Sequence, residues 1–115
     1  MSAKVPVKVG AKWTVDRDPD EESYYAADIT DELADRNTVP MAGDGAVELI
    51  VNGVEVLEGP SVQVETVDDI QRTYVVVLLG GIDSDPPEVW NWCARVRCQN
   101  GERFDKTTWF NRVDT

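Results

Sequence analysis

The fold class of this chain is decided by residues 89–110, VWNWCARVRCQNGERFDKTTWF. Two runs rich in aromatic and β-branched residues are separated there by Asn100-Gly101. Runs of this kind form strands, and Asn-Gly supplies the two positive-φ residues of a type I′ hairpin turn. The stretch therefore predicts a long β-hairpin near the end of the chain.

Side chains alternate between the two faces of such a hairpin. We expect one face to point into the core; it carries Trp90, Trp92, Ala94, Val96 and Cys98, with Phe104 and Phe110 on the return strand. The opposite face carries Arg95, Arg97, Arg103 and Trp109, which places Trp109 next to Arg95 or Arg97. An exposed indole there would anchor a partner, whereas the alternative is an indole packed under a loop.

The rest of the chain also consists of short strand-like segments separated by turn residues. Strands are expected at residues 12–15, 24–29, 47–51, 54–57, 61–66 and 73–79, with one helical turn near residues 30–36. Asn52-Gly53 predicts a second hairpin, between residues 47–51 and 54–57. About seven to eight strands at spacings of roughly 8 to 12 residues are typical of an antiparallel sandwich or barrel, so the fold class is all-β.

The chain has 115 residues, which is enough for one domain with its own core. We assign residues 11–115 to a single β-sandwich domain and residues 1–10 to an N-terminal arm that carries Lys4 and Lys8. This arm could pair at a sheet edge, or it could stay extended until a partner orders it.

The charge is strongly negative and unevenly distributed. The formal net charge is −11, which repels nucleic acid and anionic membranes. Residues 1–13 carry +3, residues 14–92 carry −16 and residues 93–115 carry +2. Basic ends and an acidic middle favour pairing between copies, although a solubilising surface is the plainer reading. The apolar run at residues 75–79 is too short to cross a bilayer, and no signal peptide is recognisable, so we expect synthesis in the cytoplasm.

The sequence has hydroxyl and carboxylate side chains but lacks the usual catalytic motifs. It contains no histidine, no nucleotide-binding glycine motif and no nucleophile elbow. Cys93 and Cys98 are five residues apart on one expected strand, so they point to opposite faces and are expected to be free thiols. We therefore expect no enzyme, no catalytic residues and no cofactor.

Two acidic clusters could bind a cation. The first contains Asp16, Asp18, Asp20, Glu21 and Glu22, and the second contains Asp83, Asp85 and Glu88. Oxygen-rich loops of this kind can hold calcium, but prolines break the EF-hand pattern in both. A solvated loop and a charged contact with a basic partner are the alternatives, and no metal ligand is assigned.

The chain has an Asp-Pro-Asp turn at residues 18–20 and a Gly-Gly pair at residues 80–81, and together with the closing hairpin these motifs resemble those of the phage fibre-tail adaptor family. The segment Arg17-Asp18-Pro19-Asp20-Glu21-Glu22-Ser23-Tyr24 is similar to the Asp-Pro-Asp opening of that family, and residues 80–81 match its Gly-Gly loop. Residues 89–113 match its closing hairpin, with Asn91 early and Gly101 at the tip. The tryptophan-rich hairpin and the basic arm depart from the family pattern. The resemblance implies an immunoglobulin-like sandwich in a small virion protein, and it implies no catalytic residues.

Two classes of function follow from these observations. The first is a bacteriophage structural protein, most simply a tail adaptor that links the tail or neck to fibres, with capsid cement and head–tail connector as alternatives. Its partners would be other virion proteins and further copies of itself in a symmetric ring, with no nucleic acid or membrane. The second is a carbohydrate- or calcium-binding module that uses Trp90 or Trp109 as a platform. The candidate interface residues are Lys4, Lys8, Lys12, Arg95, Arg97, Arg103 and Trp109.

Overall fold

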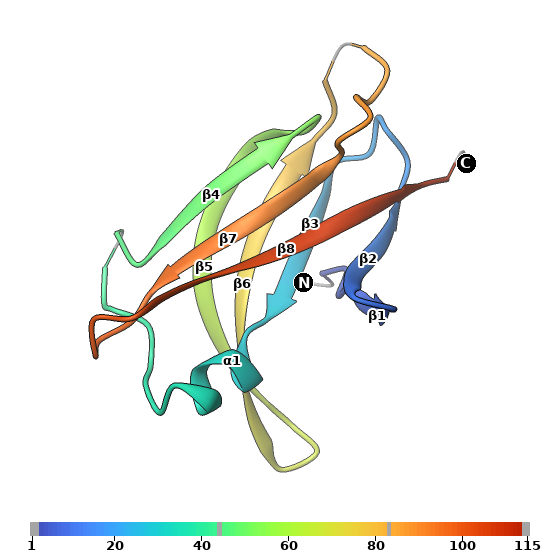
Figure 1. Ribbon diagram of the computed structural model, residues 1–115. Coiled ribbons are helices and arrows are strands. Elements are labelled where there is room, and N and C mark those ends of the chain that lie inside the picture. Colours follow the sequence, from blue (N-terminus) through green and yellow to red (C-terminus); the bar gives the residue numbers. More distant parts are fainter. Residues whose placement is uncertain (1–2, 44, 83, 114–115) are drawn as a thin grey trace.

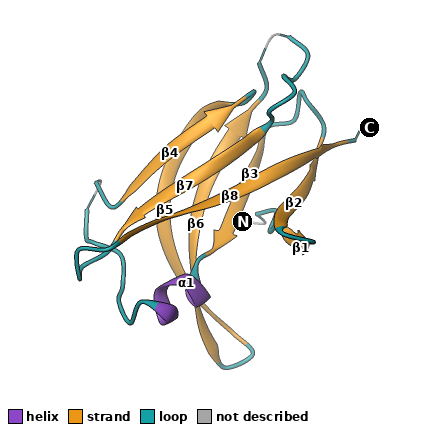
Figure 2. Ribbon diagram, viewed as in Figure 1, coloured by secondary structure: helices purple, strands orange, loops and turns teal. Residues whose placement is uncertain are grey.

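Two β-sheets pack face to face in the computed structural model, which describes residues 3–43, 45–82 and 84–113 (Figure 1). The elements are β1 (Val7–Val9), β2 (Lys12–Arg17), β3 (Ser23–Asp28), α1 (Thr30–Asp35), β4 (Val47–Asn52), β5 (Glu55–Val67), β6 (Ile70–Gly80), β7 (Asn91–Arg97) and β8 (Arg103–Arg112). One sheet has the order β1-β2-β8-β7-β4 and the other has the order β3-β6-β5. The expectation of a mostly β, sandwich-like protein is confirmed (Figure 2).

The closing hairpin forms as expected, but its turn differs. β7 and β8 pair antiparallel from Asn91 opposite Trp109 to Arg97 opposite Arg103. Gly101 has a φ of 91°, its N–H donates to the Cys98 carbonyl at 3.1 Å, and Asn100 does not have a positive φ. The type I′ prediction is therefore wrong, and the loop is of the longer kind that ends on a left-handed glycine.

A two-residue turn with positive φ at both positions lies at another place in the chain. It joins β5 to β6 through Asp68 and Asp69, whose φ angles are 52° and 65°. Neither residue is glycine, so this turn holds two side chains in a conformation that costs free energy. The sequence predicts only a polar corner at this position.

The second predicted hairpin is wrong. β4 pairs with β7 in the five-stranded sheet, whereas β5 pairs with β6 in the other sheet, so Asn52-Gly53 carries the chain from one sheet to the other. The Trp90 indole donates to the Gly53 carbonyl at 3.2 Å, and a Cβ on Gly53 would lie 2.7 Å from that ring. Glycine is needed there because Trp90 approaches the backbone closely.

The sheets are also not purely antiparallel. β2 runs parallel to β8, with Trp13 opposite Thr108 and Arg17 opposite Arg112. In this sheet β2 lies between β1 and β8, so the parallel pair joins a strand from the start of the chain to the last strand.

The N-terminal segment packs against the sandwich and is not a free arm. Lys4 pairs with the edge of β3, where its N–H donates to the Tyr24 carbonyl at 2.9 Å and its carbonyl accepts from Ala26 at 2.9 Å. Pro6 is buried, and β1 pairs with β2. Of the two expectations for residues 1–10, pairing at a sheet edge is the one observed for the described residues.

The core lies between the sheets, where the inward face of the closing hairpin meets β3 and β6. The predicted inward residues of β7 and β8 are buried, among them Trp92, Ala94 and Val96 at 0% exposure. β6 is the middle strand of its sheet and contributes Val75 and Val77 to this core. The alternation of side chains along the closing hairpin is therefore confirmed.

Both cysteines are free, as expected. Cys98 belongs to the core cluster, whereas Cys93 is buried on the outward face of β7. Burial raises the pKa of the Cys98 thiol above its usual range, which keeps it protonated and unreactive.

Candidate protein-interaction surfaces

The largest exposed backbone edge in the described part of the chain belongs to β5. This strand is 13 residues long, and every one of its residues except Pro60 is exposed. β6 is its one strand partner among the described residues, so its other edge is open. Together β5 and β6 form a hairpin whose tip projects beyond α1 (Figure 1).

The open half of β5, residues 61–67, is an amphipathic strand. Its register with β6 places Val62 opposite Val75 and Val64 opposite Thr73, on the face turned toward the other sheet. Val62 is nevertheless 37% exposed and Val64 is 55% exposed. The opposite face carries Gln63 and Glu65.

This edge lacks most of the features that prevent strands from pairing with other chains. Natural edges are shortened, covered, or protected by lysine, proline or bulges. In β5 the register shifts lie at residues 56–61, around the cis peptide bond Gly59-Pro60, and the strand has no lysine. Residues 61–67 are regular and unbulged, so this half is available for strand addition.

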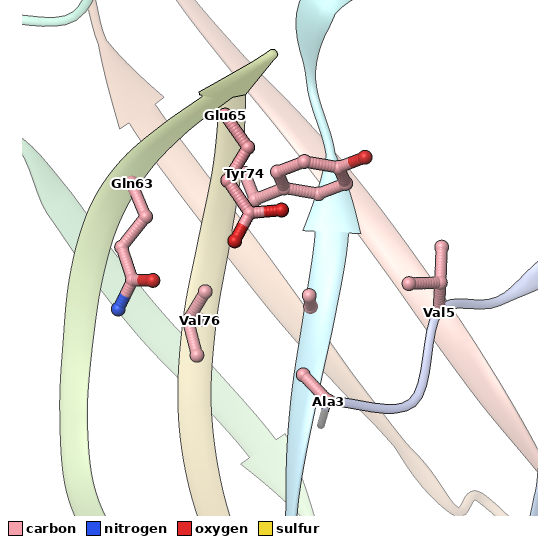
Figure 3. A pocket seen from close by; sticks show the side chains of 7 residues that line it. Ala3, Val5, Gln63, Glu65, Tyr74 and Val76 are labelled. Atoms are coloured by element: carbon pink, nitrogen blue, oxygen red, sulfur yellow. The ribbon is translucent and has the colours of Figure 1, made fainter. Parts of the chain in front are cut away.

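A groove crosses the outer face of the three-stranded sheet. It has a volume of about 410 Å³ and is lined by Ala3, Val5, Ala26, Gln63, Glu65, Tyr74 and Val76. Figure 3 shows the N-terminal residues on one side, the β5 side chains on the other, and the Tyr74 ring projecting from β6 between them. The groove shows that residues 3–5 and β5 lie along opposite margins of this sheet.

The arginines of the closing hairpin differ in how far ion pairs within the fold neutralise their charge. Arg95 donates to both carboxylate oxygens of Asp105, at 2.9 and 3.2 Å, and lies 3.5 Å from Glu48. The hydrogen bond from Arg95 lowers the pKa of Asp105. Arg97 and Arg103 are exposed and directly opposite each other, so their two positive charges are presented together.

Trp109 does not lie beside Arg95 or Arg97, and that expectation is wrong. The register places it opposite Asn91, near the far end of the hairpin. The ammonium group of Lys12 lies 4.3 Å from the centroid of its ring, which makes a cation–π contact and leaves the indole half-buried. Lys12 and Trp109 therefore form a patch separate from Arg97 and Arg103.

The two remaining candidates, both lysines of the N-terminal segment, have different roles. Lys4 makes a 2.7 Å ion pair with Glu21, so its charge is used within the fold. Burial alone would raise the pKa of Glu21, but hydrogen bonds from Lys4, Tyr25 and the Asp18 backbone lower it to about 2. Lys8 lies on β1, is exposed, and makes no ion pair within the described residues.

Sequence reasoning missed the buried cationic residues Arg17 and Lys106. Arg17 is 0% exposed, donates to the Tyr25 hydroxyl at 3.0 Å and to the Glu21 carbonyl at 2.9 Å, and stacks on Tyr25 and Phe110. Burial raises the pKa of Tyr25, which keeps its hydroxyl protonated. The sequence offers one sign that Arg17 is buried. Side chains alternate between the faces of a strand, so Arg17 lies on the same face of β2 as Trp13 and Val15. These contacts hold the Asp-Pro turn to the core and form no open site.

Lys106 is buried in the same way near α1. Its ammonium group donates to the Asp28 carbonyl, pairs with Glu32 at 3.1 Å and lies 4.1 Å from the Trp13 ring centroid. Its apolar stem and satisfied charge explain why a lysine stands among the inward residues of β8. This lysine is structural.

The two acidic loops come together, as a cation site would require. A hollow of about 340 Å³ between them is lined by Asp18, Pro19, Asp20, Ile82, Ser84, Asp85 and Arg112. Within residues 3–43, 45–82 and 84–113, no group of three or more acidic or thiol side chains is placed to hold a metal ion. Asp83 lies outside the described residues.

The tryptophan platform of a carbohydrate module does not form as expected. Trp90 is 7% exposed and packs on Phe110 with ring centroids 5.2 Å apart, so its face is unavailable to a sugar. Trp109 is partly covered by Lys12. Trp90 therefore takes the inward position expected from the alternation of the hairpin, and its alternative use as a sugar platform is not observed.

No family model, curated protein or solved structure matches this chain. No helix in the described part of the chain is long and apolar enough to span a membrane.

Proposed function

We propose that this protein is a non-enzymatic structural protein of a bacteriophage virion, which acts as a tail adaptor between the tail or neck and the fibres. The observation that carries the proposal is the open, regular edge of β5, with its exposed valines on one face and a glutamate on the other. Such an edge adds a strand from another chain without rearrangement of the fold. The function proposed is thus to join protein subunits.

An immunoglobulin-like topology is part of this proposal. In an immunoglobulin sandwich of the constant type, the first, second, fourth and fifth strands form one sheet, and the third, sixth and seventh form the other. When β2 is counted as the first strand, β3-β6-β5 and β4-β7-β8 follow this division, whereas β2 departs from it and lies beside β8. The strand order therefore supports the fold that the adaptor resemblance implies.

The motifs that support the adaptor family are the Asp-Pro-Asp turn before β3 and the closing hairpin. Arg17, Glu21 and Tyr25 hold that turn against the core, so the matching residues have a structural reason to be there. Capsid cement and head–tail connector are alternatives within the same class, because they use the same kind of surface.

The test is to locate the protein in particles of the phage that encodes it. Immunogold labelling with an antibody against the purified chain is expected at the tail or neck, and deletion of the gene is expected to give particles without fibres. Labelling over the capsid shell would favour cement instead. Absence of the protein from purified particles would refute the virion role.

A further inference from the structure

We infer that the open edge of β5 in one copy binds β1 of a second copy, so that copies join head to tail. This inference rests on the proposed assembly function and names the partner of the same surface. The acceptor edge is residues 61–67 of β5, and the donor edge is β1. Both edges are unpaired on their outer side within the described residues.

The two edges carry opposite charge. Residues 1–13 contain Lys4, Lys8 and Lys12 and no acidic residue. Residues 55–72 contain five acidic residues and one arginine, and that arginine, Arg72, is already paired with Asp28 at 2.7 Å. Lys8 on the donor edge and Glu65 on the acceptor edge are both exposed and without an ion pair in the described fold. Complementary potentials of this kind fix the choice and register of partners.

Their apolar side chains are complementary as well. On the donor edge, Val7 and Val9 are 63% and 62% exposed, and they alternate with Lys8. On the acceptor edge, Val62 and Val64 alternate with Gln63 and Glu65. Since side chains on a strand have a period of two, a register that places Lys8 opposite Glu65 also places one donor valine opposite Val64 and the other opposite Thr66, on the other face.

The positions of the donor and acceptor edges determine which symmetry the assembled copies can have. Lys4 pairs with β3, so the N-terminal segment lies on the β3 side of the three-stranded sheet, whereas β5 is the opposite edge of that sheet. One copy therefore presents its donor and acceptor edges on different sides, and it cannot satisfy both with a single neighbour in a two-fold dimer. Contacts of this heterologous kind close into a ring or extend as a filament.

The experiment measures self-association of the full chain by sedimentation velocity over a range of concentrations. The wild type is expected to associate, and Lys8→Glu and Glu65→Lys are each expected to weaken association at least tenfold. The double variant Lys8→Glu/Glu65→Lys is expected to recover it. An equimolar mixture of the two single variants is expected to recover it too, because every contact between unlike copies then joins opposite charges.

Glu88→Lys is the matched control, since Glu88 is an exposed acid in the segment before β7 and belongs to neither edge, and it is expected to associate like the wild type. Circular dichroism and thermal unfolding of each variant exclude loss of folding as the cause. A monomeric wild type at all concentrations, or single variants that associate like the control, would overturn the inference. So would failure of both the double variant and the mixture to recover.

These results separate the two proposals. A chain that is found in particles yet never self-associates contradicts the head-to-tail contact and leaves the virion role standing. A chain that self-associates as described but is absent from particles contradicts the virion role alone.

Discussion

Replacement of Trp92 by alanine tests whether the closing hairpin holds the sandwich together. The indole is 0% exposed in the middle of the core. Burial of about 200 Å² of aromatic surface at about 25 cal/mol/Å² stabilises the fold by about 5 kcal/mol. The indole nitrogen has no hydrogen-bond partner within the described residues, so its removal offsets about 1 kcal/mol of that loss. We expect Trp92→Ala to lower the free energy of unfolding by about 4 kcal/mol, within the range of about 3–5 kcal/mol typical of buried tryptophan.

Trp109→Ala is the matched control, because Trp109 lies on the outer face of the same hairpin and is half-buried. We expect it to cost about 1 kcal/mol, mostly through the lost contact with Lys12. Urea unfolding followed by circular dichroism measures both, and a slope of about 2 kcal/mol/M would shift the midpoint by about 2 M for Trp92→Ala. Equal losses for the two variants, or a loss below about 1.5 kcal/mol for Trp92→Ala, would refute the assignment of the inward face.

Three further predictions follow from single contacts. The pKa of Glu21 in the folded state, about 2, lies below its usual 4.5, so its ion pair stabilises the fold above pH 4.5 and loses that effect as the pH falls toward 2. We expect Glu21→Gln to lower the unfolding free energy by about 1–3 kcal/mol near neutral pH. Urea titrations should show this difference shrinking as the pH falls from 4.5 toward 2, and a difference that stays constant would contradict the prediction. Asp68→Asn/Asp69→Gly should raise the unfolding free energy by about 1 kcal/mol, because Asn-Gly adopts positive φ at lower cost; a lower midpoint in urea would argue against strain in this turn. Arg97→Ala should leave the unfolding free energy within about 0.5 kcal/mol of wild type while it weakens binding to purified tail particles, and unchanged binding would remove Arg97 from the interface.

The local alternation of the closing hairpin could be predicted from the sequence, because the two-residue period of a strand needs no knowledge of its partner. The inward positions of Trp92 and Val96 and the outward position of Arg97 follow from that period alone. The neighbours expected for Trp109 were wrong because Arg95 and Arg97 lie too near the turn: a two-residue turn at Asn100-Gly101 already places Trp109 opposite Trp92, and the observed loop places it opposite Asn91. An Asn-Gly signal of equal strength at residues 52–53 led to a wrong hairpin, since turn chemistry does not say which sheet the next strand joins.

The acceptor edge of β5 could not be predicted from the sequence for a similar reason. Gly59-Pro60 is typical of the end of a strand. In the structure, register shifts accommodate these two residues, and β5 continues to Val67. Two short expected strands are therefore one long edge strand, and its exposure becomes visible only when its partners are known. The charge distribution, in contrast, could be read directly from the residues and pointed to contacts between basic ends and an acidic middle.

The most direct test of the assembly account is amide hydrogen exchange of the wild-type chain at low and high concentration, analysed by mass spectrometry. Backbone amides in residues 61–67 and in β1 are expected to become protected together as copies associate, while the outer face of the closing hairpin and α1 stay unchanged. Association without protection of β5, or protection confined to another surface, would contradict the claim that this edge joins the subunits.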